Sequence, residues 1–212
     1  MDKIDRLKLI LSWGFRGALL VAAIIALVIH DWKDFAFLLV ILFLSFSSDI
    51  IERKLQVDYP SELDILILIF ISASMYLGEI QDFYFRFVWW DIMLHAVSGI
   101  IVGGIGFSLV FVLNRHERVA VKLSPVFVAV FAFCFAVAVG SLWEIFEFGM
   151  DQIFGLNMQK SGLVDTMWDL IVNALGAFVF SLLGYLHMIG HINLFKSMEK
   201  RFFKLNPEFK KR

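Results

Sequence analysis

The sequence predicts an all-α integral membrane protein, a six-helix transmembrane bundle with both termini in the cytoplasm. Three observations predict this fold class: the composition, six long apolar runs, and an uneven distribution of lysine and arginine. The chain of 212 residues is 60% hydrophobic and 18% charged, and its mean hydropathy is +0.80. A typical soluble domain is about 45–50% apolar and about 25% charged. The composition therefore places most of the chain in lipid and excludes a disordered chain, a disulfide scaffold and a nucleic-acid-binding module.

Each apolar run is close to the length of about 20 residues that a helix needs to cross a bilayer. A membrane β-strand would alternate apolar and polar residues over about ten positions, whereas these runs are apolar on every side. We therefore predict helical spans at residues 9–29, 35–51, 63–80, 90–113, 126–148 and 166–189. We expect one transmembrane domain over residues 1–212, of which residues 196–212 form a basic cytoplasmic tail.

The first run follows three basic residues, as the apolar segment of a secretory signal peptide does. It is longer than the 7–15 apolar residues of such a peptide, and no small-x-small cleavage site follows it at residues 30–33. We therefore expect a retained first helix. Arg16 in that helix and Asp49 in the second span are predicted to form a buried ion pair that joins the two helices, because unpaired charges inside a membrane are costly.

Six spans place both termini on one side of the membrane, and the basic residues indicate which side it is. The termini, the second loop and the fourth loop hold fifteen lysines and arginines, whereas the other three loops hold only Lys33, Arg86 and Lys160. Cytoplasmic loops carry an excess of these residues, so we expect both termini in the cytoplasm. Every tryptophan except Trp13 falls near the predicted outer boundary, where such rings prefer to lie. The basic tail is expected to be solvated rather than bound to the inner leaflet.

The last three spans carry polar residues that a plain lipid anchor would not need. Within each span these residues are three or four positions apart, so they share one helix face. They are Asp91 and His95 in the fourth span, Glu144 and Glu147 in the fifth, and Asp165, Asp169 and Asn173 in the sixth. The predicted topology brings the three faces together at the outer end of the bundle, where ten acidic residues stand against three basic ones. Such a site must take up protons, bind a cation or hold water.

A divalent metal ion would neutralise these carboxylates and orient the histidine. We expect the ligands, or side chains that support them, among Asp91, His95, Glu144, Glu147, Asp165 and Asp169, with Asn173 orienting a ligand or a water molecule. Carboxylates with an imidazole suit Zn²⁺, Mn²⁺ or Fe²⁺, and an all-oxygen subset suits Mg²⁺ or Ca²⁺. The alternative is a hydrated helix junction in which the acids pair with Arg86 or Lys160.

Three blocks in the second half of the chain resemble a known family. They are Trp90-Asp91-x-x-x-His95-x-x-x-Gly99, then Gly140-x-x-Trp143-Glu144-x-x-Glu147, then Asp165-Thr166-x-x-Asp169-x-x-x-Asn173-x-x-Gly176-Ala177. In order and spacing, residues 89–184 look like the YjdF-type family of small multi-pass bacterial inner-membrane proteins. The resemblance implies a bacterial inner (cytoplasmic) membrane location and singles out these residues, and it implies no reaction.

A metal site in a membrane leads to two candidate functions. A metal-dependent hydrolase would act on a lipid or lipid-linked group at the outer leaflet, with Glu147 or Asp165 as the general base. A cation transporter or proton-coupled transporter would need a polar route to the inner side, and Ser181 is the only such residue of the sixth span between Asn173 and the histidines near its end. We therefore rank the hydrolase first, the transporter second and a non-catalytic membrane scaffold third. Besides the possible lipid or lipid-linked substrate, the sequence indicates the lipid bilayer as a partner. It does not determine the oligomeric state.

Overall fold

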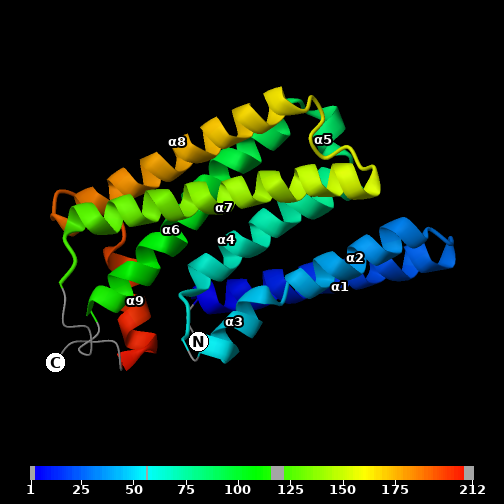
Figure 1. The fold of residues 1–212 in the computed structure, drawn as a ribbon. Helices are drawn as coiled ribbons and strands as arrows, with labels where there is room; N and C mark the ends of the chain where they lie inside the picture. The colour runs from blue at the N-terminus through cyan, green and yellow to red at the C-terminus, as the bar shows by residue number, and fades with distance from the viewer. Residues whose placement is uncertain (1–2, 56, 116–121, 208–212) are drawn as a thin grey trace. The chain divides into compact units, whose positions relative to one another are not determined.

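A computed structural model describes residues 3–55, 57–115 and 122–207 of the chain, which form helices joined by short connections. Six helical segments are long and apolar enough to cross a membrane: Lys3–Val28, Trp32–Lys54, Ser61–Ile80, Trp89–Phe111, Pro125–Phe154 and Leu163–Met188 (Figure 1). The predicted six-helix membrane bundle is thereby confirmed, with helix ends a few residues from the expected ones. The cytoplasmic location of the termini and the single domain stay predictions.

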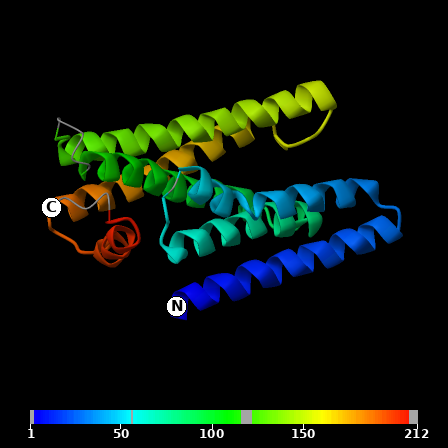
Figure 2. The ribbon, with the colours of Figure 1, turned by 90° about the horizontal axis from the view of Figure 1, so that it is seen from below.

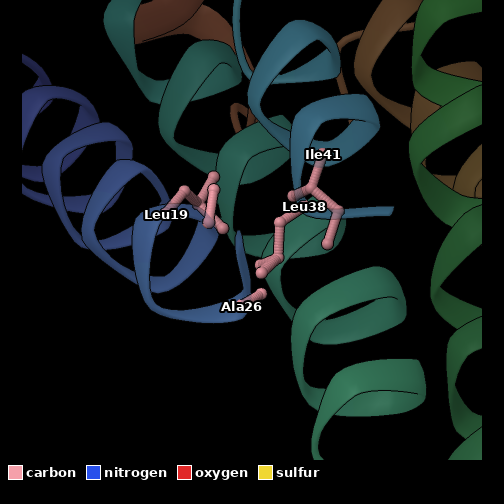
Figure 3. Close-up of a cluster of buried hydrophobic side chains, with 5 residues drawn as sticks. Leu19, Ala26, Leu38 and Ile41 are labelled. Carbon is pink, nitrogen blue, oxygen red and sulfur yellow. The ribbon is translucent and has the colours of Figure 1, made fainter. Parts of the chain in front are cut away.

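The chain folds as two compact units, the first of which holds the first three spans and residues Met198–Pro207. Its elements are α1 (Lys3–Val28), α2 (Trp32–Leu44), α3 (Ser47–Leu55), α4 (Ser61–Ile71), the π-helix η1 (Ser72–Ile80), α5 (Phe83–Arg86) and most of α9 (Lys196–Leu205). Its core is small and apolar: Leu19 and Ala26 of α1 face Leu38 and Ile41 of α2 (Figure 3). Many large apolar side chains outside this core stay exposed, as contact with lipid requires.

The second predicted span is interrupted, because α2 ends at Leu44 and α3 begins at Ser47. The predicted ion pair lies at this break: Arg16 Nη2 donates to Asp49 Oδ2 at 2.5 Å and to the backbone oxygen of Ser45 at 2.6 Å. A carbonyl group released from a helix inside a membrane must find another donor. Arg16 supplies that donor, so the pair confirmed here also stabilises the break.

The basic tail is more ordered than the solvated segment that the sequence predicts. Residues 196–205 form α9, and Arg201 donates hydrogen bonds to Asp5 of α1 and Glu62 of α4. Asn206 is only 2% exposed. Its side-chain oxygen accepts the backbone N–H of Asp58 at 2.8 Å, and its side-chain nitrogen donates to the backbone oxygen of Asp58 at 2.7 Å. These contacts hold the described part of the tail against the first unit, and residues 208–212 lie outside the described part.

Replacing Asn206 with alanine is expected to release α9. The variant leaves the backbone groups of Asp58 without the amide that they contact, at a cost of about 1–3 kcal/mol for a buried group. Amide hydrogen exchange and trypsin cleavage within residues 196–205 should both become faster. The control is Asn193→Ala, which changes an exposed asparagine just before α9. Equal protection of α9 in the two variants would show that Asn206 does not hold it.

The second unit is built from the last three spans, α6 (Trp89–Arg115), α7 (Pro125–Phe154) and α8 (Leu163–Met188). These helices run side by side in both views (Figures 1 and 2). α7 starts at Pro125 after Ser124, whose hydroxyl accepts the N–H of Phe127, and it ends at Phe154, before Gly155 with a φ of 66°. Proline at the first position and glycine beyond the last are typical of helix ends. This unit carries all the residues of the predicted site.

Candidate metal centre

Small residues bring α6 and α8 close enough for their polar faces to meet. A Cβ atom at Gly99 of α6 would collide with the backbone oxygen of Asn173, and one at Gly176 of α8 would collide with that of Ala96. Gly140 of α7 plays a similar part, since a Cβ there would lie 2.5 Å from Asn173 Oδ1. Small side chains at helix crossings allow this approach in membrane proteins. The glycines thus pack the three helices of one chain around Asn173.

One side chain from each of the three helices meets at a buried cluster, which we call the buried triad: His95 of α6, Glu144 of α7 and Asp169 of α8. One donor atom from each residue lies within 4.8 Å of the other two. His95 Nδ1 is 3.7 Å from Glu144 Oε1, and His95 Nε2 is 4.0 Å from Asp169 Oδ2. All three residues are less than a tenth exposed. An imidazole and two carboxylates converge here from segments up to 74 positions apart in the sequence.

A second cluster, the rim triad, consists of Asp91, Asp165 and Asp169, and it shares Asp169 with the buried triad. Its carboxylate oxygens also lie within 4.8 Å of one another, and Asp91 and Asp165 are half-buried. Lys160, from the connection between α7 and α8, donates to Asp91 Oδ2 at 2.7 Å. The other oxygen of Asp91, Oδ1, is 3.6 Å from His95 Nε2. The two triads therefore form one polar centre with a lysine ammonium at its edge.

Several buried polar atoms of the centre have no hydrogen-bond partner among the described residues. They are both carboxylate oxygens of Glu144, which is 4% exposed, and Oδ1 of Asn173. A buried carboxylate without a donor is strongly unfavourable, and in a membrane it is more so. An imidazole nitrogen with several carboxylate oxygens is a donor set that suits a transition-metal ion. The residues present thus fit a divalent cation, which would satisfy Glu144 and Asp169 together.

The other predicted site residues occupy distinct positions. Asp165 lies in the rim triad, whereas Glu147 belongs to neither triad and accepts a hydrogen bond from Trp143 Nε1 at 2.7 Å. Asn173 Nδ2 donates to Ser98 Oγ at 3.1 Å, and that hydroxyl donates to the backbone oxygen of His95 at 2.8 Å. Asn173 therefore braces the helix turn that carries His95. Five of the six predicted ligand candidates belong to the two triads, and Glu147 lies outside both and contacts Trp143.

The sequence places Asp151 on the polar face of the fifth span and Trp143 in one of the three family-like blocks, but neither was predicted as a ligand or a catalytic residue. Asp151 accepts the backbone N–H groups of Met158 and Gln159, at 2.7 and 2.9 Å, and so shapes the connection that carries Lys160. Trp143 and Glu147 are four positions apart on one helix, a spacing that brings side chains together. The tryptophan was expected near the outer boundary of the membrane, and the structure adds its hydrogen bond to Glu147.

The fold and this centre define a class of protein: a multi-pass helical membrane protein with a histidine and carboxylates buried between its last three spans. The chain belongs to the family described as "Predicted membrane protein (DUF2238)", whose model matches residues 11–190. It is 26% identical over 140 residues to an "Uncharacterized protein" of Thermotoga maritima, which covers 66% of this chain and 70% of the relative. No solved structure matches the chain. This match confirms that the chain belongs to a family of membrane proteins, and the YjdF-type resemblance stays a prediction.

Proposed function

We propose that this protein is a metal-dependent membrane hydrolase whose metal ion is held by His95, Glu144 and Asp169. The observation that carries the proposal is the buried triad itself: three helices contribute one donor each within 4.8 Å, and both oxygens of Glu144 are buried without a hydrogen-bond partner among the described residues. The nitrogen His95 Nδ1 lies 3.7 Å from Glu144 Oε1, which is too far for a hydrogen bond. A divalent cation is the partner that best fits these donor atoms, and the candidates are Zn²⁺, Mn²⁺, Fe²⁺ and Mg²⁺.

The chemistry that such an ion supplies is Lewis acidity toward a phosphoryl or carbonyl oxygen and activation of a water molecule. The general base in this proposal is Asp165, which belongs to the rim triad and is half-buried. Glu147 is the second choice, because its Oε1 already accepts the indole N–H of Trp143. The substrate class is a lipid or a lipid-linked group, since the centre lies between helices that are long and apolar enough to span a membrane.

The location of the protein is part of the same proposal. We infer a bacterial inner membrane, cytoplasmic termini and a centre that opens toward the outer face. The distribution of lysine and arginine over the loops supports this orientation. The resemblance of residues 89–184 to the YjdF-type family supports the inner membrane as the location.

A cation or proton-coupled transporter is the second candidate, and buried acids within spans favour it in general. It requires a polar route through the second unit. Below Asn173, α8 presents Gly176, Ala177 and Gly184 with the single hydroxyl of Ser181 to the interior. Because these residues offer few ligands along the way, the hydrolase is preferred. A non-catalytic scaffold stays the third candidate.

Bound metal per chain, measured by elemental mass spectrometry on detergent-purified protein, tests the proposal. Wild-type protein is expected to hold about one Zn²⁺, Mn²⁺ or Fe²⁺ per chain, and Glu144→Gln and Asp169→Asn are each expected to lose it, since each removes a charged ligand. The matched control is Asp82→Asn. Asp82 is exposed and has a left-handed backbone conformation, which asparagine also adopts, so this variant removes an acidic group without straining the backbone. Wild-type protein that stays metal-free after incubation with each of these ions and with Mg²⁺ would overturn the metal site.

The reaction class is tested with the metal-loaded protein in liposomes. Mass spectrometry should detect loss of a lipid and release of its hydrolysed group, and Asp165→Asn should slow this turnover by about 10²-fold or more, as for loss of a general base. An assay of Mn²⁺ entry into the same liposomes runs in parallel. Flux without lipid turnover would reject the hydrolase in favour of the transporter, and neither activity would favour the scaffold.

A further inference from the structure

The centre holds two groups of donors, yet one of them already contacts a positive charge of the protein. The buried triad and the rim triad share Asp169, as the two sites of a dinuclear centre share a bridging carboxylate. Two-metal hydrolytic sites place their ions about 3.5–4 Å apart. At the rim triad, however, the Lys160 ammonium lies 2.7 Å from Asp91 Oδ2.

The chain holds this lysine in place. Asp151 accepts the N–H groups of Met158 and Gln159, and the Gln159 side chain donates to Thr166 Oγ1 at 2.7 Å. These three hydrogen bonds fix the backbone immediately before Lys160 to the end of α7 and the first turn of α8. The lysine side chain is 28% exposed and its Asp91 partner 15%, so the pair is shielded more than an ordinary surface pair.

The charges of the centre agree with this arrangement. Its four carboxylates, Asp91, Glu144, Asp165 and Asp169, carry up to four negative charges beside one histidine. One divalent ion alone would leave most of the rim triad uncompensated, and a second divalent ion would neutralise all four. A single divalent ion together with one ammonium group leaves at most one negative charge, which Asp165 needs in order to act as a base.

We propose that Lys160 is the second cation of this centre: its ammonium group takes the position that a second metal ion has in a dinuclear hydrolase, so the centre binds one divalent ion, in the buried triad. This inference rests on the proposed function. Lysine is a compact charge with three N–H donors.

The test is the number of Zn²⁺ ions per chain, measured by elemental mass spectrometry after saturation and removal of unbound metal. Wild-type protein is expected to hold about one ion, and Lys160→Gln about two, because the rim triad then lacks its ammonium group. Lys160→Met removes the same charge and must give the same result. Lys160→Arg keeps the charge and should stay at about one. Lys33→Gln, which removes an exposed lysine outside the centre, should also stay at about one.

A double variant, Lys160→Gln with Asp165→Asn, tests whether the extra ion lies in the rim triad, to which Asp165 belongs. The number of Zn²⁺ ions per chain should return to about one. Two ions in wild-type protein, or one ion in both Lys160→Gln and Lys160→Met, would overturn the role of Lys160 while the metal site stands. Absence of metal from wild-type protein and from both charge-removing variants would overturn the proposed function, and this inference with it.

Discussion

Alanine at Gly99 is expected to destabilise the second unit by about 2 kcal/mol or more and to abolish the metal binding that we propose for it. The added Cβ would overlap the backbone oxygen of Asn173, which cannot rotate away as a side chain can. Overpacking of this kind typically costs about 1–3 kcal/mol. To relieve it, α6 and α8 must separate, and His95 and Asp169 then lose their common geometry. The measurements are the unfolding midpoint in detergent and the metal content of the folded protein.

Alanine at another helical glycine is a matched control, for which the expected change in stability is zero or of opposite sign. A Cβ atom at Gly149 of α7 would meet no atom of a neighbouring element within 4 Å. In a helix, alanine is favoured over glycine by about 1 kcal/mol, so Gly149→Ala should leave stability unchanged or raise it. Gly176→Ala should behave as Gly99→Ala does, because it meets the Ala96 oxygen from the other helix. Equal stability of Gly99→Ala and Gly149→Ala would contradict the close crossing.

Leucine at Arg16 is expected to cost about 3 kcal/mol in the first unit. Arg16 is 8% exposed and contacts Asp49 and the Ser45 backbone oxygen, while its guanidinium group lies 3.8 Å from the centre of the Phe46 ring. The variant leaves a carboxylate and a helix-end carbonyl without their donor. Removing one partner of a buried pair generally costs about 3–5 kcal/mol, and Asp49 keeps some contact with solvent, which favours the lower value.

A double-mutant cycle separates the charge from the packing. Arg16→Leu with Asp49→Leu should be less destabilising than the sum of the two single variants, because no unpaired charge is left behind. Arg6→Leu, at an exposed arginine of the same helix, should change stability by no more than about 0.5 kcal/mol. Strict additivity of the two single variants would mean that the ion pair contributes no coupling.

The sequence alone determined the features that depend on local period and on the chemistry of the bilayer. The six spans follow from composition and length, since a single apolar segment in lipid can form all its backbone hydrogen bonds internally only as a helix. The shared face of Asp91 and His95, or of Asp169 and Asn173, follows from a spacing of four. The ion pair of Arg16 and Asp49 was predictable because a membrane gives each charge few other partners.

The tertiary structure decided what depends on the distance and rotation between helices. It placed Glu144 with His95 and Asp169, and turned Glu147, three positions later, toward Trp143. It chose Lys160 as the partner of Asp91, where the sequence left Arg86 as an alternative, and it interrupted the second span at Ser45. A helical period states which residues share a face, but close contacts such as that of Gly99 with Asn173 set how far apart two faces lie. Only that separation determines which donors can share one ion.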